Sequence, residues 1–167
     1  MSGSIHGQSH ITASGNIKAE GEIIGKAGLL EYVVTAAGVI EGKGDVVFFG
    51  STTSMDPGQI YMYGQSGGTD WAKADANQVA KADGLLGVAL GDSSNTDGVL
   101  LRGMVTLDHD PGTAGDPLFL SSASIGLASS TAPTGNGDVV RVIGYCVNSS
   151  NNQIFFNPDG TFIEVTA

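Results

Sequence analysis

Apolar residues in this sequence occur in short clusters, and residues that favour turns separate one cluster from the next. The clusters have the length of β-strands, and the residues between them are mainly Gly, Asp, Asn, Ser and Thr. Glycine contributes 26 of the 167 residues, which disfavours long helices. The sequence therefore predicts an all-β protein. The clusters span residues 29–34, 45–50, 59–64, 84–90, 98–107, 116–120, 138–147, 153–156 and 161–165.

Two Asp-Pro-Gly triplets, at residues 56–58 and 110–112, lie between apolar clusters. Proline sets the φ angle that the second position of a type II turn requires, and glycine adopts the positive φ of the third position. We therefore predict type II turns at both triplets. Only residues 72–83 have a composition suited to a helix, and the sequence leaves open whether they form one or two helical turns.

The first part of the chain carries a six-residue repeat. An aliphatic residue recurs at every sixth position, with small residues two positions before and after most of them. This hexad pattern suits a triangular β-helix, in which each six-residue segment forms one face and points its aliphatic side chain inward. The repeated aliphatic residues are Ile5, Ile11, Ile17, Ile23 and Leu29.

So few hexads make fewer than two coils, and an array of that length cannot bury its own faces. We therefore predict that several copies, most simply three, share this segment and that the repeated aliphatic residues form an oligomer interface. The segment is either a short trimeric β-helix or an extended segment exchanged between copies. The alternative is a chance periodicity in a Gly-, Ser- and Ala-rich tail that orders only on a partner.

The repeat and the apolar clusters divide the chain into three parts. Residues 1–34 form the hexad-repeat segment, which we call the arm and expect to serve assembly or attachment. Residues 71–167 carry longer and more hydrophobic clusters, which predict a compact antiparallel β-barrel or sandwich. Residues 35–70 are either a neck between arm and body or additional strands of the same body.

The charge balance argues against several partners. The chain has 17 acidic and 7 basic side chains, a formal net charge of -10 and no basic cluster, so we expect neither nucleic acid nor an anionic membrane surface as a partner. No apolar run reaches the roughly 18 residues of a membrane helix. The first ten residues lack the basic and apolar blocks of a secretion signal.

Cys146 lies in an apolar cluster and is expected to be a buried hydrophobic residue.

Asp108, His109 and Asp110 are the strongest candidates for chemistry. An Asp-His-Asp cluster can bind a divalent metal or pair a base with its orienting carboxylate. It directly precedes a Pro-Gly turn, however, where Asp is favoured for side-chain bonds to the backbone. In an extended segment His109 also points away from its two neighbours. We therefore predict a turn, with no catalytic residue, no metal and no cofactor; a small metal-dependent hydrolase is the alternative.

Tyr61, Tyr63 and Trp71 lie near one another in sequence beside a polar loop. Tyr61 and Tyr63 are two residues apart and share one face of a strand. The three rings form a candidate glycan-binding set, because aromatic side chains stack on sugar rings. The favoured alternative is that they pack on a neighbouring sheet or subunit.

Five blocks between Trp71 and Val165 resemble a β-structured module of tailed-bacteriophage virion surface proteins, which serve as head decoration, head-fibre or tail-fibre components. The blocks are WAKADA, GLLGVALG, GVLLRGMVTLDHDPGTAGDPLFLS, TAPTGNGDVVRVIGYCV and QIFFNPDGTFIEV. The segment ITASGNIKAEGEI, at residues 11–23, is similar in composition to the short-repeat shafts of phage fibre proteins. The resemblance implies a protein that is not an enzyme.

The resemblance and the repeat together lead to an expected function. We expect a homotrimeric capsid decoration or cement protein, made in the host cytoplasm and located on the outer capsid surface of the virion. Its partners would be other copies of itself and the major capsid protein lattice or other virion proteins. The sequence has no long shaft, which disfavours a far-reaching fibre. The alternative is a short tail or head fibre, or a receptor-binding tip, that recognises host surface glycans.

Overall fold

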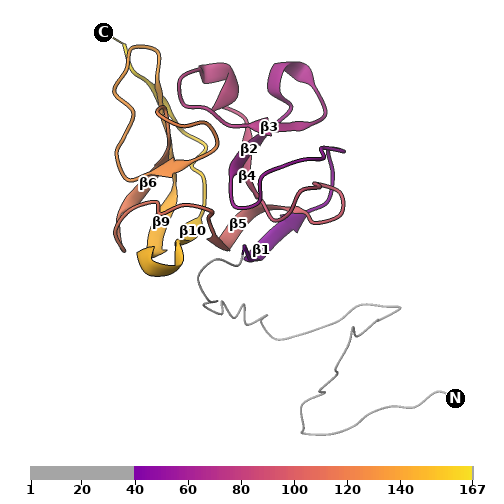
Figure 1. Ribbon diagram of the computed structural model, residues 1–167. Helices are drawn as coiled ribbons and strands as arrows, with labels where there is room; N and C mark the ends of the chain where they lie inside the picture. Colours follow the sequence, from indigo (N-terminus) through magenta and orange to yellow (C-terminus); the bar gives the residue numbers. More distant parts are fainter. Residues whose placement is uncertain (1–39, 167) are drawn as a thin grey trace, which may run out of the picture. The chain divides into compact units, whose positions relative to one another are not determined.

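The computed structural model describes residues 40–166, and its regular elements there are β-strands and three single-turn 3-10 helices (Figure 1). The prediction of an all-β protein is confirmed. Among the described residues, no helix has the length and apolar character needed to cross a membrane. The strands are β1 (Gly42–Val47), β2 (Ile60–Tyr63), β3 (Trp71–Lys73), β4 (Leu85–Ala89), β5 (Val99–Thr106), β6 (Pro117–Leu120), β7 (Ala128–Ser129), β8 (Val139–Val140), β9 (Val142–Asn148), β10 (Gln153–Phe156) and β11 (Ile163–Glu164).

Nine of these strands form one antiparallel sheet, which curls into a half-barrel. The strand order is β3-β2-β4-β5-β10-β9-β6-β7, and β1 pairs with β5 outside this path. One edge of β5 pairs with β1 along most of its length, while the other edge pairs first with β4 and then with β10. Strand β5 therefore joins the half of the sheet that contains β3, β2 and β4 to the half that contains β10, β9, β6 and β7. Strands β8 and β11 form a separate pair.

The arm and all five repeated aliphatic residues lie outside the described residues. From residue 40 onward, the segment predicted as a neck or as additional strands supplies β1 and β2 to the main sheet. Within residues 72–83, a single 3-10 turn forms at η2 (Val79–Lys81). Such a short turn fits a segment that has no apolar stripe long enough to bury.

The two Asp-Pro-Gly triplets turn the chain in different ways. Gly58 has a φ of 82°, and the amide of Gln59 donates to the carbonyl of Asp56 over 3.2 Å, as the predicted type II turn requires. Gly112 has a φ of 142°, and its amide donates to the side-chain carboxylate of Asp110 over 3.0 Å. The second triplet is therefore an Asx turn, because the side chain of Asp110 replaces the backbone acceptor.

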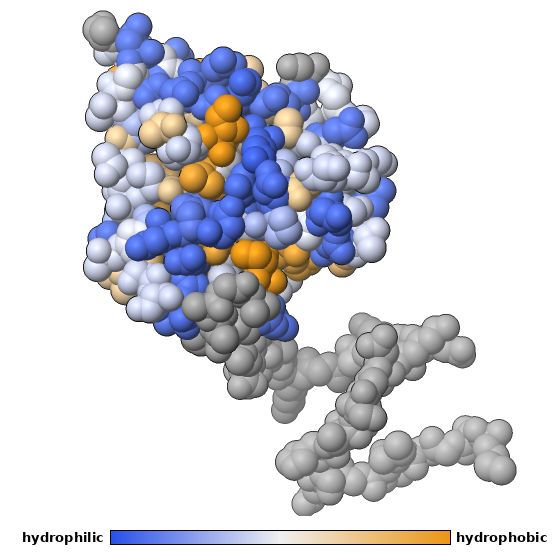
Figure 2. Space-filling model, in the orientation of Figure 1, coloured by the Kyte–Doolittle hydropathy of each residue, from blue (hydrophilic) through white to orange (hydrophobic). Residues whose placement is uncertain are grey.

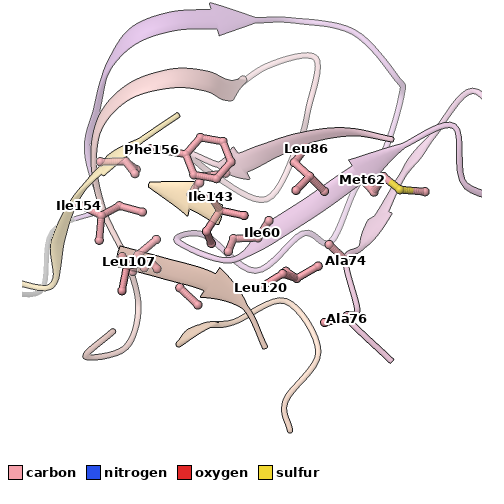
Figure 3. Packing of buried hydrophobic residues seen from close by; sticks show 14 of the residues in the cluster. Ile60, Met62, Ala74, Ala76, Leu86, Leu107, Leu120, Ile143, Ile154 and Phe156 are labelled. Atoms are coloured by element: carbon pink, nitrogen blue, oxygen red, sulfur yellow. The ribbon is translucent and has the colours of Figure 1, made fainter. Parts of the chain in front are cut away.

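The hydrophobic core fills the inside of the curled sheet, where side chains from β2, β4, β6, β9 and β10 converge (Figure 3). Ile154 and Phe156 of β10 are fully buried, and Ile143 of β9 packs in the same cluster. Cys146 belongs to it as well and is 2% exposed, which confirms its predicted burial.

Glycine is required where neighbouring strands approach most closely. Gly103 of β5 has a φ of 139°, and a Cβ there would lie 2.2 Å from the carbonyl oxygen of Lys43 in β1. Gly144 of β9 has a φ of 151°, and its Cβ would lie 2.0 Å from the carbonyl oxygen of Phe155. Glycines inside strands are typical of tight bends in curved sheets, so these two positions allow the main sheet to curl.

A buried arginine ties the two halves of the sheet together. Arg141, next to β9, is 6% exposed. Its Nη1 donates to the carbonyls of Ala82 (2.6 Å) and Gly84 (2.8 Å), just before β4, and its Nε donates to the carbonyl of Asp159 (2.7 Å). Burial lowers the pKa of the guanidinium. The three carbonyls compensate for the water that the charged group loses.

Candidate functional site

The outer side of the main sheet, opposite the core, carries apolar side chains over β5, β10, β9 and β6. Because Ile154 and Phe156 point into the core, Phe155 between them points outward. The register places Phe155 beside Met104 of β5 on one side and beside Tyr145 of β9 on the other.

The same row continues to β6, where Pro117 pairs with Tyr145. We define the open face as Met104, Pro117, Tyr145, Val147 and Phe155. Tyr145 is 51% exposed and Val147 is 43% exposed. At about 4.8 Å between strands, the row from Met104 to Pro117 is about 14 Å long. Figure 2 shows apolar groups at the surface between polar ones. A contiguous apolar row is typical of an interaction site.

A positive charge lies at one end of the open face. Arg102 is two residues before Met104 on β5, so both side chains lie on the outer side of the sheet. Arg102 is exposed, and within residues 40–166 it makes no ion pair or side-chain hydrogen bond. Lys43, opposite Met104 on β1, is already paired with Glu41 at 3.1 Å. The open face therefore combines an apolar row with one unpaired guanidinium.

The other half of the outer side, over β2, β3, β4 and the start of β5, is covered by residues 48–55, which we call the covering loop. Phe49 of this loop packs against Tyr63 and Trp71, with ring centroids 4.8 Å and 5.5 Å away. Met55 joins Trp71 in a second hydrophobic cluster. The chain itself therefore buries this half of the outer side.

Hydrogen bonds hold the aromatic residues and the covering loop together. Trp71 Nε1 donates to the carbonyl of Phe49 over 2.9 Å, and the Tyr61 hydroxyl accepts from the amide of Asp56 over 2.8 Å. Trp71 and Tyr61 are 3% and 4% exposed, and burial raises the pKa of Tyr61. The structure brings the predicted glycan-binding residues Tyr61, Tyr63 and Trp71 together, and only Tyr63 remains partly accessible. Glycan binding by these rings stays a prediction.

A β-bulge in β5 separates the open and covered halves. In the β1–β5 ladder Asp45 lies opposite Arg102, but the next residue, Val46, lies opposite Leu100, so β5 carries one extra residue there. A bulge exchanges the two faces of a strand. Leu100 therefore points into the core before the bulge, and Val105 does so after it.

Asp108 and His109 interact with each other and with the backbone. His109 Nε2 accepts from the amide of Ala128 over 3.0 Å, which places the ring proton on Nδ1, 2.7 Å from Asp108 Oδ1. The side chain of Asp110 accepts the amide of Gly112. Within residues 40–166, no three His, Cys, Asp or Glu side chains are grouped so as to hold a metal ion. In this arrangement His109 joins the segment after β5 to β7.

A hollow of about 290 Å³ lies beside β7 and the loop that follows it. Its lining is rich in hydroxyl groups and includes one buried carboxylate, that of Asp138. Asp138 accepts the amide of Gly135 over 2.9 Å. Such a lining suits a small polar ligand that offers hydroxyl groups. The lining residues are Ser121, Ser122, Ala123, Ser129, Thr131, Ala132, Pro133, Thr134, Gly135 and Asp138.

A scan against protein-family models, a search of curated proteins and a search of solved structures each found no match to this chain.

Proposed function

We propose that this protein is a non-enzymatic structural protein of a tailed-bacteriophage virion, and that it decorates the outer surface of the head as a homotrimer and stabilises it. The observation that carries the proposal is the open face, an apolar row across four strands that ends beside the exposed Arg102. A surface of this kind favours contact with protein.

Two further features support the proposal. The blocks that resemble phage virion proteins run through β3 to β11, which include every strand of the open face. In a trimer, three modest contacts with the capsid lattice act together, which raises overall attachment through effective concentration. Net negative charge keeps unassembled copies soluble.

The proposal is tested by counting copies in purified virions by quantitative mass spectrometry. A head decoration protein is expected at hundreds of copies per particle. A few dozen copies or fewer would indicate a tail appendage, and absence from the virion would refute both.

Binding to heads that lack the protein then tests the role of the open face. Tyr145→Asp is expected to weaken co-sedimentation with heads or to prevent trimer formation, because it places a charge in the apolar row. Ile125→Asp is the matched control, because Ile125 is also 51% exposed but lies outside the open face. If the two variants bind heads and form trimers equally well, the open face does not take part in either contact.

The second candidate is a short fibre or receptor-binding tip that recognises host surface glycans, and the hydroxyl-lined hollow favours it. A glycan array with the full-length protein tests this candidate. Binding that Thr134→Val abolishes would support it, whereas binding that only Tyr63→Ala abolishes would favour the aromatic cluster instead.

A further inference from the structure

The hydroxyl-lined hollow contains two side chains that are buried and still have unused hydrogen-bonding capacity. Ser121, which follows β6, is 6% exposed, and Asp138, which precedes β8, is 8% exposed. Both line the hollow. Buried polar groups normally have partners, because an unpartnered one costs free energy. The capacity that these two residues leave unused therefore indicates what a ligand must offer.

The side chain of Ser121 can offer only a donor. Its Oγ accepts the amides of Ala123 and Ser124, each over 3.1 Å. These bonds use both lone pairs of the hydroxyl oxygen, so only the O–H hydrogen is left, and within residues 40–166 it donates to no acceptor. The backbone of Ser121 is fixed, because its amide donates to Leu127 and its carbonyl accepts from Ala76.

The side chain of Asp138 can offer only an acceptor. Its Oδ2 accepts the amide of Gly135 over 2.9 Å, whereas its Oδ1 accepts from no group among residues 40–166. A Cβ at Gly135 would lie 2.8 Å from Oδ2 and 3.1 Å from Oδ1. The φ of Gly135 lies outside the left-handed region, so its backbone could carry a side chain. Glycine at this position therefore keeps one side of the carboxylate open.

The open donor and the open acceptor do not satisfy each other, because no hydrogen bond joins Ser121 to Asp138. A ligand that serves both must donate to a carboxylate and accept from a hydroxyl. Adjacent hydroxyl groups on one ring do this, since each can donate and accept. Ser129 of β7 adds a further hydroxyl, whose oxygen accepts the amide of Thr131 over 3.0 Å. The hollow therefore matches a ligand with several neighbouring hydroxyl groups.

The charge and the size of the hollow narrow the ligand class. Its lining includes the carboxylate of Asp138 and no Lys, Arg or His, so a ligand with its own negative charge would be repelled. A volume of about 290 Å³ is at the small end of the range for ligand pockets and suits one sugar ring. Ala132 and Pro133 provide apolar surface for the C–H groups of such a ring.

We infer that the hollow binds one neutral monosaccharide unit, with Asp138 accepting from one ring hydroxyl and Ser121 donating to a neighbouring one. The inference rests on the second candidate function for its role and gives that candidate a ligand class. The hollow has no aromatic ring in its lining, and a single sugar unit has few atoms, so we expect a Kd of about 1 mM.

NMR titration of the full-length, ¹⁵N-labelled protein with glucose, galactose and mannose tests the inference. At least one of these neutral hexoses is expected to shift the amide resonance of Gly135. The matching uronic acid, in which a carboxylate replaces one CH₂OH group, is expected to bind at least about tenfold more weakly. If no hexose shifts this resonance at up to about 100 mM, or if the uronic acid binds equally well, the inference is wrong.

Two variants locate the sugar. Asp138→Asn keeps an oxygen for the amide of Gly135 and turns the open acceptor into a donor, so hexose affinity should fall at least about tenfold. Gly135→Ala should lower it similarly, because the methyl group covers the carboxylate. Gly160→Ala is the matched control, because nothing lies within 4 Å of a Cβ there, and it should bind as the wild type does. Melting temperatures identify any variant that does not fold.

The outcomes separate the inference from the function on which it rests. Unchanged affinity in a folded Asp138→Asn or Gly135→Ala protein overturns the inference. Loss of hexose binding in Tyr63→Ala alone also overturns it and leaves the receptor-binding candidate standing through the aromatic cluster. Hexose binding that Asp138→Asn abolishes, without recognition of any glycan on the array, supports the site and refutes the receptor-binding role.

Discussion

The covered and open halves of the outer sheet surface are built from similar side chains and differ in what lies over them. Trp71 and Tyr61 are nearly inaccessible beneath the covering loop, whereas Tyr145 is 51% exposed. The covering loop follows β1 directly and bonds to β3, where the hydroxyl of Thr52 accepts the amide of Trp71 over 2.7 Å. Apolar strand faces therefore do not by themselves define the core. Which half becomes interior depends on whether the chain supplies a segment to cover it.

The largest expected difference is between aromatic residues of the two halves. Trp71→Ala should lower the free energy of unfolding by about 3–5 kcal/mol, because it leaves a cavity under the covering loop. Tyr145→Ala should change it by less than about 1 kcal/mol in dilute protein, because the side chain is half exposed. Urea denaturation measures both. Equal losses would mean that the open face is buried within a single copy.

Arg141 and Arg102 differ in burial in the same way as these aromatic residues. Arg141→Met should cost about 3 kcal/mol in unfolding free energy, because it removes three hydrogen bonds and leaves buried carbonyls unpaired. Arg102→Met should change stability by no more than about 0.5 kcal/mol, since Arg102 is exposed and unpaired within residues 40–166. Thermal and urea unfolding test both variants. A stable Arg141→Met protein would show that the halves do not depend on this connection.

Gly103, where β5 approaches β1 closely, offers a third test. Gly103→Ala should destabilise the fold by about 2 kcal/mol or more, because the added Cβ meets the backbone of β1 at a positive φ. Gly160→Ala is the control, because nothing lies within 4 Å of a Cβ there. Differential scanning calorimetry compares them. If the two melting temperatures match, the close approach of β1 and β5 is not required.

The smallest effect concerns the two faces of β9. Burial, and then the nearby Asp110 and Asp116, raise the pKa of the Cys146 thiol, so it carries less thiolate at pH 8 than an exposed cysteine. Cys146 should react with a thiol reagent at least about tenfold more slowly than Tyr145→Cys in a Cys146→Ala background. Similar rates would mean that β9 does not separate an inner and an outer face.

The raised pKa of Cys146 also predicts a pH dependence of stability. The folded protein holds the thiol proton more tightly than the unfolded chain does. This contribution to stability is complete below the ordinary pKa of a thiol and is lost as pH rises through the folded pKa. The wild-type protein should therefore lose more stability than Cys146→Ala between pH 7 and pH 10, which urea denaturation at each pH measures.

Much of the fold could be predicted from short-range patterns. Within residues 40–166, the predicted apolar clusters contribute strands, and the Asp56-Pro57-Gly58 triplet forms the predicted turn. Both signals act over only a few residues. The cluster at 29–34 lies outside the described residues. The Gly112 turn differed because the side chain of Asp110 accepts the amide of Gly112, while the amide of Thr113, which a type II turn would direct to the Asp110 carbonyl, donates to Asp116. Strand order and the separation of the sheet into two halves depend on long-range pairing, which the local pattern does not encode.

The open face was missed for a related reason. Cluster 138–147 is apolar on both sides of the strand, so alternation could not tell Tyr145 from Cys146. An apolar cluster without alternation is itself a sign that both faces will be covered. That sign was the available hint. The hexad residues Ile5 to Leu29 lie outside the described residues, so their shared interface stays a prediction.

The placement of β1 has a mechanical consequence. Strand β1 is the first strand of the described residues, and its ladder with β5 runs from Gly42 to Val47. Ladder bonds lie across the strands, so a pull along β1 from the preceding segment loads all of them in shear. Tension on the arm would reach the central strand β5 before it could peel any outer strand away.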